Sequence, residues 1–180
     1  MHEKTLARKT VFDGRLVRVE TLQVELENGQ TAYRELVRHQ GAVCVLLRAP
    51  DARLALVRQF RVGAQKQMLE VVAGILDPGE APDDAARREV REETGFTLTR
   101  LARMGVLYPT PGYVDERIVC YYAEAGGQGA RELDHDERVE VELLEESEFI
   151  ARIRRGEIED AKTLAAWSLY QAGAAESPAP

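Results

Sequence analysis

The sequence contains little cysteine and little histidine, the residues that build disulfide frameworks and zinc sites. Its two cysteines, Cys44 and Cys120, each lie within an apolar run typical of a strand. We therefore expect both to be buried, reduced thiols, in preference to a disulfide or a metal site. The three histidines, His2, His39 and His135, are scattered along the chain. They lack the spacing that zinc ligands require.

The chain also lacks an excess of positive charge. Its 24 lysines and arginines are outnumbered by 31 aspartates and glutamates, which gives a net charge of −7. Tight binding to DNA or RNA is disfavoured, because it depends on neutralising many phosphates with basic side chains. An acidic protein can still bind a phosphate compound when a divalent metal first reverses the local charge.

Long hydrophobic runs are absent as well. No apolar run approaches the roughly 20 residues that a membrane-spanning helix needs, and the first 14 residues contain no apolar core of a secretion signal. The sequence therefore predicts a cytoplasmic protein that has no membrane partner.

The order of apolar runs and turn signals predicts an α+β protein, with helices packed on both sides of a mixed sheet. The pair Asn28-Gly29 indicates a hairpin with a type I′ turn, which needs positive φ at both residues. Gly126, Gly127 and Gly129 fall in an expected polar loop, residues 124–137. The expected strands span 15–26, 31–39, 42–48, 53–60, 68–74, 98–107, 117–123 and 138–144, and the expected helices span 82–94, 145–155 and 160–172.

The expected helix at 82–94 carries an unusual concentration of carboxylates. Glu89 and Glu93 are four residues apart and therefore share a face. Like charges at this spacing destabilise a helix by roughly 0.2–0.5 kcal/mol. Arg88 can pair with Glu92, whereas Glu89 and Glu93 would be served by a divalent metal. The alternative is a solvated acidic face with local salt bridges, which is common on helices.

The residues around this cluster favour the metal. Nine specified positions within 23 residues complete a pattern that resembles the motif of the Nudix hydrolase family. They are Gly74, Glu80, Arg88, Glu89, Val90, Glu92, Glu93, Gly95 and Phe96. We expect Gly74 and Gly79 to allow a tight turn between strand and helix.

The resemblance implies a fold, a cofactor and a set of roles. The fold is a Nudix-type α/β/α sandwich, and the cofactor is Mg²⁺, with Mn²⁺ possible. The implied metal ligands are Glu89, Glu93 and the backbone carbonyl of Ala73. Glu92 is either a further ligand or is held by Arg88, which is expected to orient glutamates. Glu80 either fixes the loop or meets the metal through water.

The flanking residues resemble the ADP-ribose pyrophosphatase branch of that family, from about residue 10 to about residue 172. Pro111 lies sixteen residues beyond Gly95, where that branch has a proline. The implied contacts with the substrate are Arg34, Glu35, Arg61, Thr110, Pro111, Gly112 and Glu116. Taken alone, Thr110-Pro111-Gly112 is equally compatible with an ordinary turn, and the alternative for Arg61 is a surface arginine at the edge of a strand.

The general base is expected in the acidic segment 133–142. Asp134, Asp136 and Glu137 all qualify, because a carboxylate near a metal can accept a proton from water. We favour Glu137 as the base, with Asp136 as an alternative on the metal side. A solvated acidic loop is the competing interpretation.

The implied reaction is hydrolysis of ADP-ribose to AMP and ribose 5-phosphate. Alternatives are hydrolysis of another nucleoside-diphosphate sugar or a non-catalytic nucleotide-binding module on this fold, although such modules usually show a degraded motif. Hydrolysis of oxidised nucleoside triphosphates is disfavoured by the place of Pro111. The resemblance also implies a homodimer with exchanged N-terminal strands. We expect residues 1–40 to form the dimerisation and adenosine-site element, 41–172 the hydrolase domain and 173–180 a disordered tail.

Overall fold

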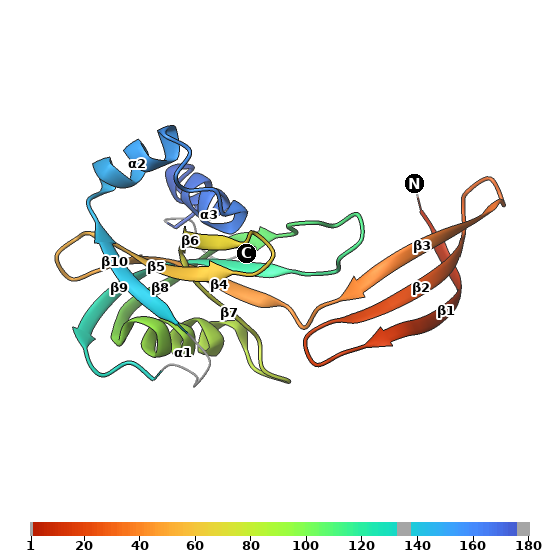
Figure 1. The fold of residues 1–180 in the computed structure, drawn as a ribbon, viewed down its shortest axis with the longest axis horizontal. Helices are drawn as coiled ribbons and strands as arrows, with labels where there is room; N and C mark the ends of the chain where they lie inside the picture. Colours follow the sequence, from red (N-terminus) through yellow and green to blue (C-terminus); the bar gives the residue numbers. More distant parts are fainter. Residues whose placement is uncertain (1, 133–137, 176–180) are drawn as a thin grey trace. The chain divides into compact units, whose positions relative to one another are not determined.

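A computed structural model describes residues 2–132 and 138–175 (Figure 1). These residues form two compact units, one made of 2–41 with 108–117 and the other of 42–107 with 118–132 and 138–175. We call them the N-terminal unit and the main unit. The elements are β1 (Lys4–Asp13), β2 (Arg18–Glu25), β3 (Thr31–Arg38), β4 (Ala42–Arg48), β5 (Leu54–Arg61), β6 (Lys66–Glu70), β7 (Val72–Ile75), α1 (Pro82–Thr94), β8 (Phe96–Leu107), β9 (Ile118–Gln128), β10 (Val139–Leu144), α2 (Glu146–Arg154) and α3 (Ala161–Gln171).

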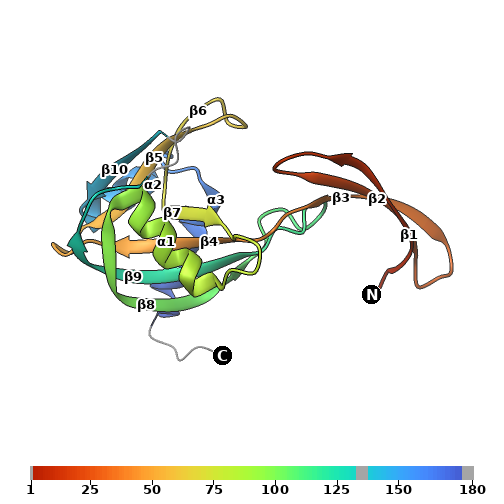
Figure 2. The same cartoon turned by 90° about the horizontal axis from the view of Figure 1, so that it is seen from below.

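The main unit is an α/β/α sandwich, as expected. Its sheet has the order β10-β5-β4-β9-β8, with β6 paired to β5 and β7 paired to β4. The pairing of β4 with β9 is parallel and the other pairings are antiparallel, so the sheet is mixed. Helix α1 covers one face, and α2 and α3 cover the other (Figures 1 and 2).

Strand β4 shows why this sheet needs two helical layers. Six of its seven residues are buried, because side chains on both faces meet a helix layer. Cys44 and Leu46 pack toward α2 and α3, whereas Val43 and Val45 pack toward α1. Cys44 lies directly opposite Cys120 on β9, and both are free, buried cysteines, as expected.

Helix α1 begins and ends where the sequence predicts. Pro82 stands in its first turn, where a missing N–H costs nothing, and Asp83 and Asp84 lie at its positive end. Gly95 ends the helix with a φ of 76°, and its N–H donates to the carbonyl of Arg91. Its apolar residues Ala85, Ala86 and Val90 are buried against the sheet.

The N-terminal unit contains an antiparallel sheet of order β1-β2-β3. The β2–β3 hairpin is confirmed, but the type I′ turn is wrong. Of the pair Asn28-Gly29, Gly29 alone has a positive φ, and its N–H donates to the carbonyl of Leu26. The chain therefore turns over residues 26–29 and continues through one left-handed glycine.

Strand β1 was not expected, because nearly all of its residues are exposed and its apolar side chains do not alternate. Two further expectations need correction. The expected strand 68–74 is two strands, β6 and β7, which pair with different neighbours. The first part of the expected loop 124–137 continues β9 to Gln128. Among the described residues, no helix is both long and apolar enough to cross a membrane.

Candidate functional site

The carboxylates of α1 are the centre of the candidate site. Glu89 is 9% exposed and Glu93 is 3% exposed, so both lie on the side of α1 that packs against the main sheet. Helix α1 packs against β7, the strand that contains Ala73 and Gly74. Burying two ionised groups is costly unless cations or hydrogen-bond donors surround them.

Gly74 leaves room for the carboxylate of Glu89 because it has no side chain. A Cβ atom placed on Gly74 would lie 1.8 Å from Oε1 of Glu89 and 1.9 Å from its Cδ. The expected tight turn does not explain this glycine, because Gly74 lies inside β7 and its φ is not positive. That explanation holds for Gly79, which has a φ of 82°. The Glu89 carboxylate therefore rests against the backbone next to Ala73.

Arg88 joins the other glutamates of the motif. Its Nε and Nη2 donate to the two oxygens of Glu80, at 2.8 and 2.9 Å. Its Nη1 donates to Glu92 at 3.0 Å, as the spacing predicts, and to Glu89 at 2.7 Å. Nη2 also donates to the carbonyl of Ile75, at 3.1 Å. Its hydrogen bonds lower the pKa of Glu80 to about 2 and raise the pKa of Arg88 itself.

These contacts separate the glutamates into two kinds. Glu80 and Glu92 are only partly buried and bind Arg88, whereas Glu89 and Glu93 are buried; Glu89 accepts from Arg88 as well and lies against the backbone of β7. Carboxylate and carbonyl oxygens at such a place fit a hard divalent cation. Within residues 2–132 and 138–175, no three Asp, Glu, His or Cys side chains gather as a metal cluster. The two buried carboxylates would thus need a carbonyl, water or substrate oxygens to complete the shell.

Arg61 stands at the end of β5 and binds Glu70. Its Nε and Nη2 donate to the two oxygens of Glu70, at 2.8 and 2.7 Å. The bonds with Glu70 raise the pKa of Arg61, and the charges of Asp160 and Glu93 act in the same direction. Arg61 therefore lies within electrostatic reach of a glutamate expected to bind metal, and its side chain is 40% exposed.

The expected substrate contacts Arg34 and Glu35 lie on β3 of the N-terminal unit. Arg34 donates to both oxygens of Glu3, at 3.1 and 2.5 Å, and to the carbonyl of Tyr33. Adjacent residues of a strand point to opposite faces. Glu35 shares its face with Thr21, its partner in register. Since β3 is an edge strand, a ligand that contacts both side chains would have to sit at its edge.

The other expected substrate contacts lie in the segment 108–117, which is hydrogen-bonded to the same strand. Val37 donates its N–H to the carbonyl of Tyr113, and Asp115 returns an N–H to the carbonyl of Val37. The Asp115 carboxylate accepts from Arg38 and from the N–H of His39, both at 2.8 Å. These contacts place Thr110, Pro111, Gly112 and Glu116 in one unit with Arg34 and Glu35.

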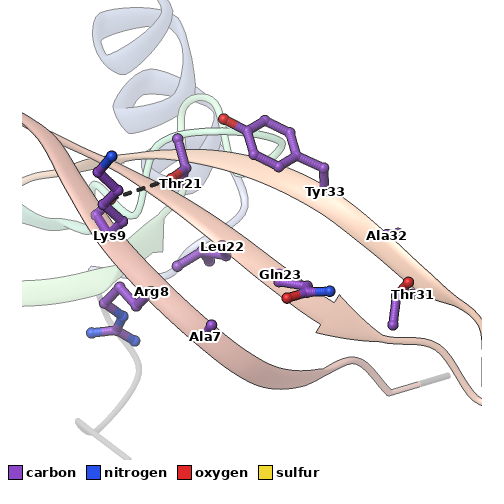
Figure 3. A pocket seen from close by; sticks show the side chains of 9 residues that line it. All are labelled: Ala7, Arg8, Lys9, Thr21, Leu22, Gln23, Thr31, Ala32 and Tyr33. Atoms are coloured by element: carbon purple, nitrogen blue, oxygen red, sulfur yellow. Dashed lines mark hydrogen bonds between the residues drawn. The ribbon is translucent and has the colours of Figure 1, made fainter.

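A hollow of about 460 Å³ opens on the N-terminal unit (Figure 3). It spans all three strands, and Tyr33 stands at one side of it, opposite Gln23 in register. The hydroxyl of Thr21 donates to the carbonyl of Lys9 across β1 and β2. The lining residues are Ala7, Arg8, Lys9, Thr21, Leu22, Gln23, Thr31, Ala32 and Tyr33. None of these residues is among the binding residues predicted from the sequence.

The expected base residues and one unpredicted ion pair remain to be placed. Asp134, Asp136 and Glu137, expected to supply the base, lie outside the described residues. Glu70 and its partner Lys162, at the start of α3, were not predicted as site residues, although the helix itself was expected at 160–172. A carboxylate in the apolar run MLEVVAG was the available signal, because a charge there needs a buried partner.

The fold and the α1 cluster match a known family. The family model described as a NUDIX domain matches residues 38–167, and the chain belongs to this family of hydrolases. Such hydrolases generally use a divalent metal and act on small molecules.

Two curated relatives match nearly the whole chain. It is 37% identical to the ADP-ribose pyrophosphatase of Bacillus subtilis strain 168 over 165 residues, which cover 91% of this chain and 89% of the relative. It is also 37% identical to the methanol dehydrogenase activator of Bacillus methanolicus over 171 residues, with coverage of 94% and 92%. A solved structure described as an ADP compounds hydrolase has the same fold. Its TM-score is 0.83 at 24% identity, with coverage of 96% of this chain and 94% of that one.

Proposed function

We propose that this protein is a magnesium-dependent hydrolase that converts ADP-ribose and water to AMP and ribose 5-phosphate. The observation that carries the proposal is the burial of Glu89 and Glu93 on α1, with the Glu89 carboxylate against the backbone of Gly74, within an intact family motif. The similarity to an ADP-ribose pyrophosphatase over 91% of the chain supports the choice of substrate.

The metal would be held by Glu89, Glu93 and the carbonyl of Ala73, with Asp136 as a further ligand. Bound Mg²⁺ supplies electrostatic stabilisation of the diphosphate oxygens and makes a nearby water more acidic. Oxygen-only ligands suit Mg²⁺, and Mn²⁺ is the alternative. Arg88 keeps Glu80 and Glu92 in place and limits the motion of Glu89, because all three share its guanidinium.

The reaction is an attack of water on one phosphorus of the diphosphate. The bond from that phosphorus to the bridging oxygen breaks, and Glu137 accepts the proton of the attacking water, with Asp136 as the alternative base. Arg61 would bind a diphosphate oxygen through the donors that Glu70 does not use. Stabilisation of the developing charge is the main source of the rate enhancement.

Specificity for the adenosine and ribose ends is assigned to the N-terminal unit. Glu35 can accept hydrogen bonds, and Arg34 would have to exchange Glu3 for a ligand. The loop containing Thr110, Pro111, Gly112 and Glu116 is proposed to contact the ribose-phosphate end. Hydrogen bonds hold this loop on β3, because they join its backbone to Val37 and its Asp115 to Arg38.

We also propose that a second copy of the chain covers the N-terminal unit. Within the described residues, this unit has strands but no helix, and β1 is an edge strand that can pair with another chain. Five of its large apolar side chains are exposed, at 46% for Leu6, 52% for Val11, 55% for Phe12, 66% for Leu16 and 62% for Tyr33. Analytical ultracentrifugation should give twice the mass of one chain. The double variant Phe12→Ser, Leu16→Ser should shift it toward one chain, and a wild-type monomer would contradict the dimer.

A substrate panel tests the reaction. The protein is incubated with Mg²⁺ and, separately, ADP-ribose, ADP- and GDP-linked hexoses, and nucleoside triphosphates, and the products are separated by chromatography. We expect AMP and ribose 5-phosphate from ADP-ribose, with no turnover in EDTA. Glu93→Gln should lower kcat by about 10³-fold or more while the melting temperature stays near that of the wild type. Faster turnover of the hexose compounds would show that one of them, and not ADP-ribose, is the substrate. No turnover of any diphosphate would favour a non-catalytic binding module.

A further inference from the structure

Glu70 is a buried carboxylate that serves two cations at once. It is 1% exposed, at the end of β6, where the chain crosses from β5 to β4. One partner is Arg61, which donates to both of its oxygens. The other is Lys162 of α3, whose Nζ donates to Oε2. Burial opposes ionisation of Glu70, but Arg61 and Lys162 outweigh it and lower its pKa.

The first turn of α3 is built to hold Lys162 in this place. Asp160 caps the helix by accepting from the N–H of Thr163 at 2.8 Å, and it also accepts from Nζ of Lys162 at 2.8 Å. Lys162 is therefore enclosed between two carboxylates, and its side chain is only 14% exposed. The other three lysines of the chain lie on β1 and β6 and are exposed.

The same turn holds the backbone that leads to Ala73. The hydroxyl of Thr163, which is fully buried, accepts from the N–H of Val71 at 2.9 Å and donates to Asp160. Helix α3 lies next to β6 (Figure 1), and its Lys162 reaches Glu70 at the end of that strand. One helix turn thus fixes both the acid that binds Arg61 and the chain two residues ahead of Ala73.

Lys162 affects how strongly the guanidinium of Arg61 can bind a phosphate. Glu70 uses two of the five guanidinium N–H donors, and the side chain remains 40% exposed. Without Lys162, the whole charge of Glu70 would fall on Arg61 and would compete with a phosphate for it. With Lys162 present, Glu70 orients the guanidinium but is itself neutralised from the other side.

We propose that Lys162 is a positioning residue for the phosphate site, which acts through Glu70 on the guanidinium of Arg61. This inference rests on the proposed function, in which Arg61 contacts the substrate diphosphate. The competing interpretation is a purely structural ion pair. Buried ion pairs are weak evidence for stability, and removing one partner often destabilises a fold without touching its chemistry.

A double-mutant cycle separates these interpretations. Lys162→Met removes the charge and keeps the length of the side chain, and Arg61→Lys removes the forked donor. We expect Lys162→Met to raise KM for ADP-ribose about 10-fold, with a smaller fall in kcat. In the Arg61→Lys background the same change should alter KM by less than about 2-fold, because the group it positions is gone. Lys162→Arg should recover KM to within about 3-fold of the wild type.

The control is Lys66→Met, which breaks the exposed ion pair of Lys66 with Glu159. It should leave KM and kcat within about 2-fold of the wild type, since exposed pairs contribute little. Melting temperatures are measured for every variant. If Lys162→Met is recovered unfolded, the cycle is run with Lys162→Gln, which keeps a donor toward Glu70.

Different results would overturn the role of Lys162 and the proposed hydrolase function. A lower melting temperature with unchanged KM, or equal effects of Lys162→Met in both backgrounds, would overturn the inference and leave the proposed function intact. A wild-type protein that turns over no diphosphate would overturn the proposed function, and the inference with it.

Discussion

The two units present their charged residues in opposite ways. In the main unit, Glu89 and Glu93 of α1 and Glu70 of β6 are each less than 10% exposed, so packed protein surrounds their carboxylates. In the N-terminal unit, Arg34 and Glu3 are each about 40% exposed and bind one another across the sheet. A buried carboxylate with fixed neighbours can hold a metal in one geometry, whereas an exposed pair can exchange partners when a ligand arrives.

Among its described residues, the N-terminal unit has one buried ionic centre, and it differs in kind from that of the main unit. Glu20 is 3% exposed and lies within 4 Å of three arginines, Arg8, Arg18 and Arg38. Arg38 passes the connection on to Asp115 of the loop 108–117. This centre holds the loop to the sheet and contains no pair of adjacent carboxylates. We infer that chemistry depends on the main unit and that the N-terminal unit contributes selectivity.

Among the changes that test this contrast between the units, the largest effect is expected from Gly74→Ala in the main unit. The new methyl group would overlap the Glu89 carboxylate, so Glu89 must turn away from Ala73. Misplacing a metal-binding group by about 1 Å costs roughly 100-fold in rate. We expect kcat/KM to fall about 100-fold, with a loss of about 1–3 kcal/mol in the free energy of unfolding. Steady-state kinetics at several Mg²⁺ concentrations and urea unfolding measure both quantities.

Gly63→Ala is the matched control for that change. A Cβ atom on Gly63 would meet no atom within 4 Å, and its φ is not positive. Its kinetics should stay within about 2-fold of the wild type. Full activity of Gly74→Ala would show that the chemistry does not need the Glu89 carboxylate where it lies, and the contrast between the two units would lose its basis.

A smaller effect is expected on the pH dependence of stability. The bonds from Arg88 lower the pKa of Glu80 to about 2, below the roughly 4.3 of an unfolded glutamate. A lowered pKa in the folded state stabilises the fold above pH of about 4, and this contribution disappears as the pH falls toward 2. Glu80→Gln should therefore lower the melting temperature at pH 7, and the difference from the wild type should shrink between pH 4 and pH 2.

Other carboxylates titrate in the same range, so the difference between the two proteins is the quantity to measure. Glu140→Gln, on the exposed side of β10, is the control. A difference between wild type and Glu80→Gln that is constant from pH 7 to pH 2 would show that Arg88 does not hold an ionised Glu80.

The sequence predicted best where local signals and burial agree. Helix α1 was predicted to the residue, because Pro82 and Gly95 mark its ends and its apolar stripe meets the core. The Asn28-Gly29 hairpin was predicted, yet its turn type was wrong, since the loop is longer than the two residues themselves. Strand β1 was missed because an exposed strand needs no alternation of apolar residues.

The site shows the same limit. The family motif led to the residues of α1, but the steric reason for Gly74 depends on where Glu89 packs, which spacing does not reveal. The bond between Glu70 and Lys162 joins residues 92 positions apart, and it needs the sheet and α3 to bring them together. The expected contacts of Arg34, Glu35 and Arg61 with substrate remain predictions.

The smallest effect is expected from the N-terminal unit, in Glu35→Gln. Loss of one charged hydrogen bond to the substrate should cost about 1.4 kcal/mol, which is a 10-fold rise in KM. Because the carboxylates proposed to bind the metal belong to the main unit, kcat should stay within about 2-fold of the wild type. Glu27→Gln, in the exposed turn of the same unit, should change neither constant. A fall in kcat at constant KM would instead place Glu35 in the chemistry, and the two units could no longer be assigned separate tasks.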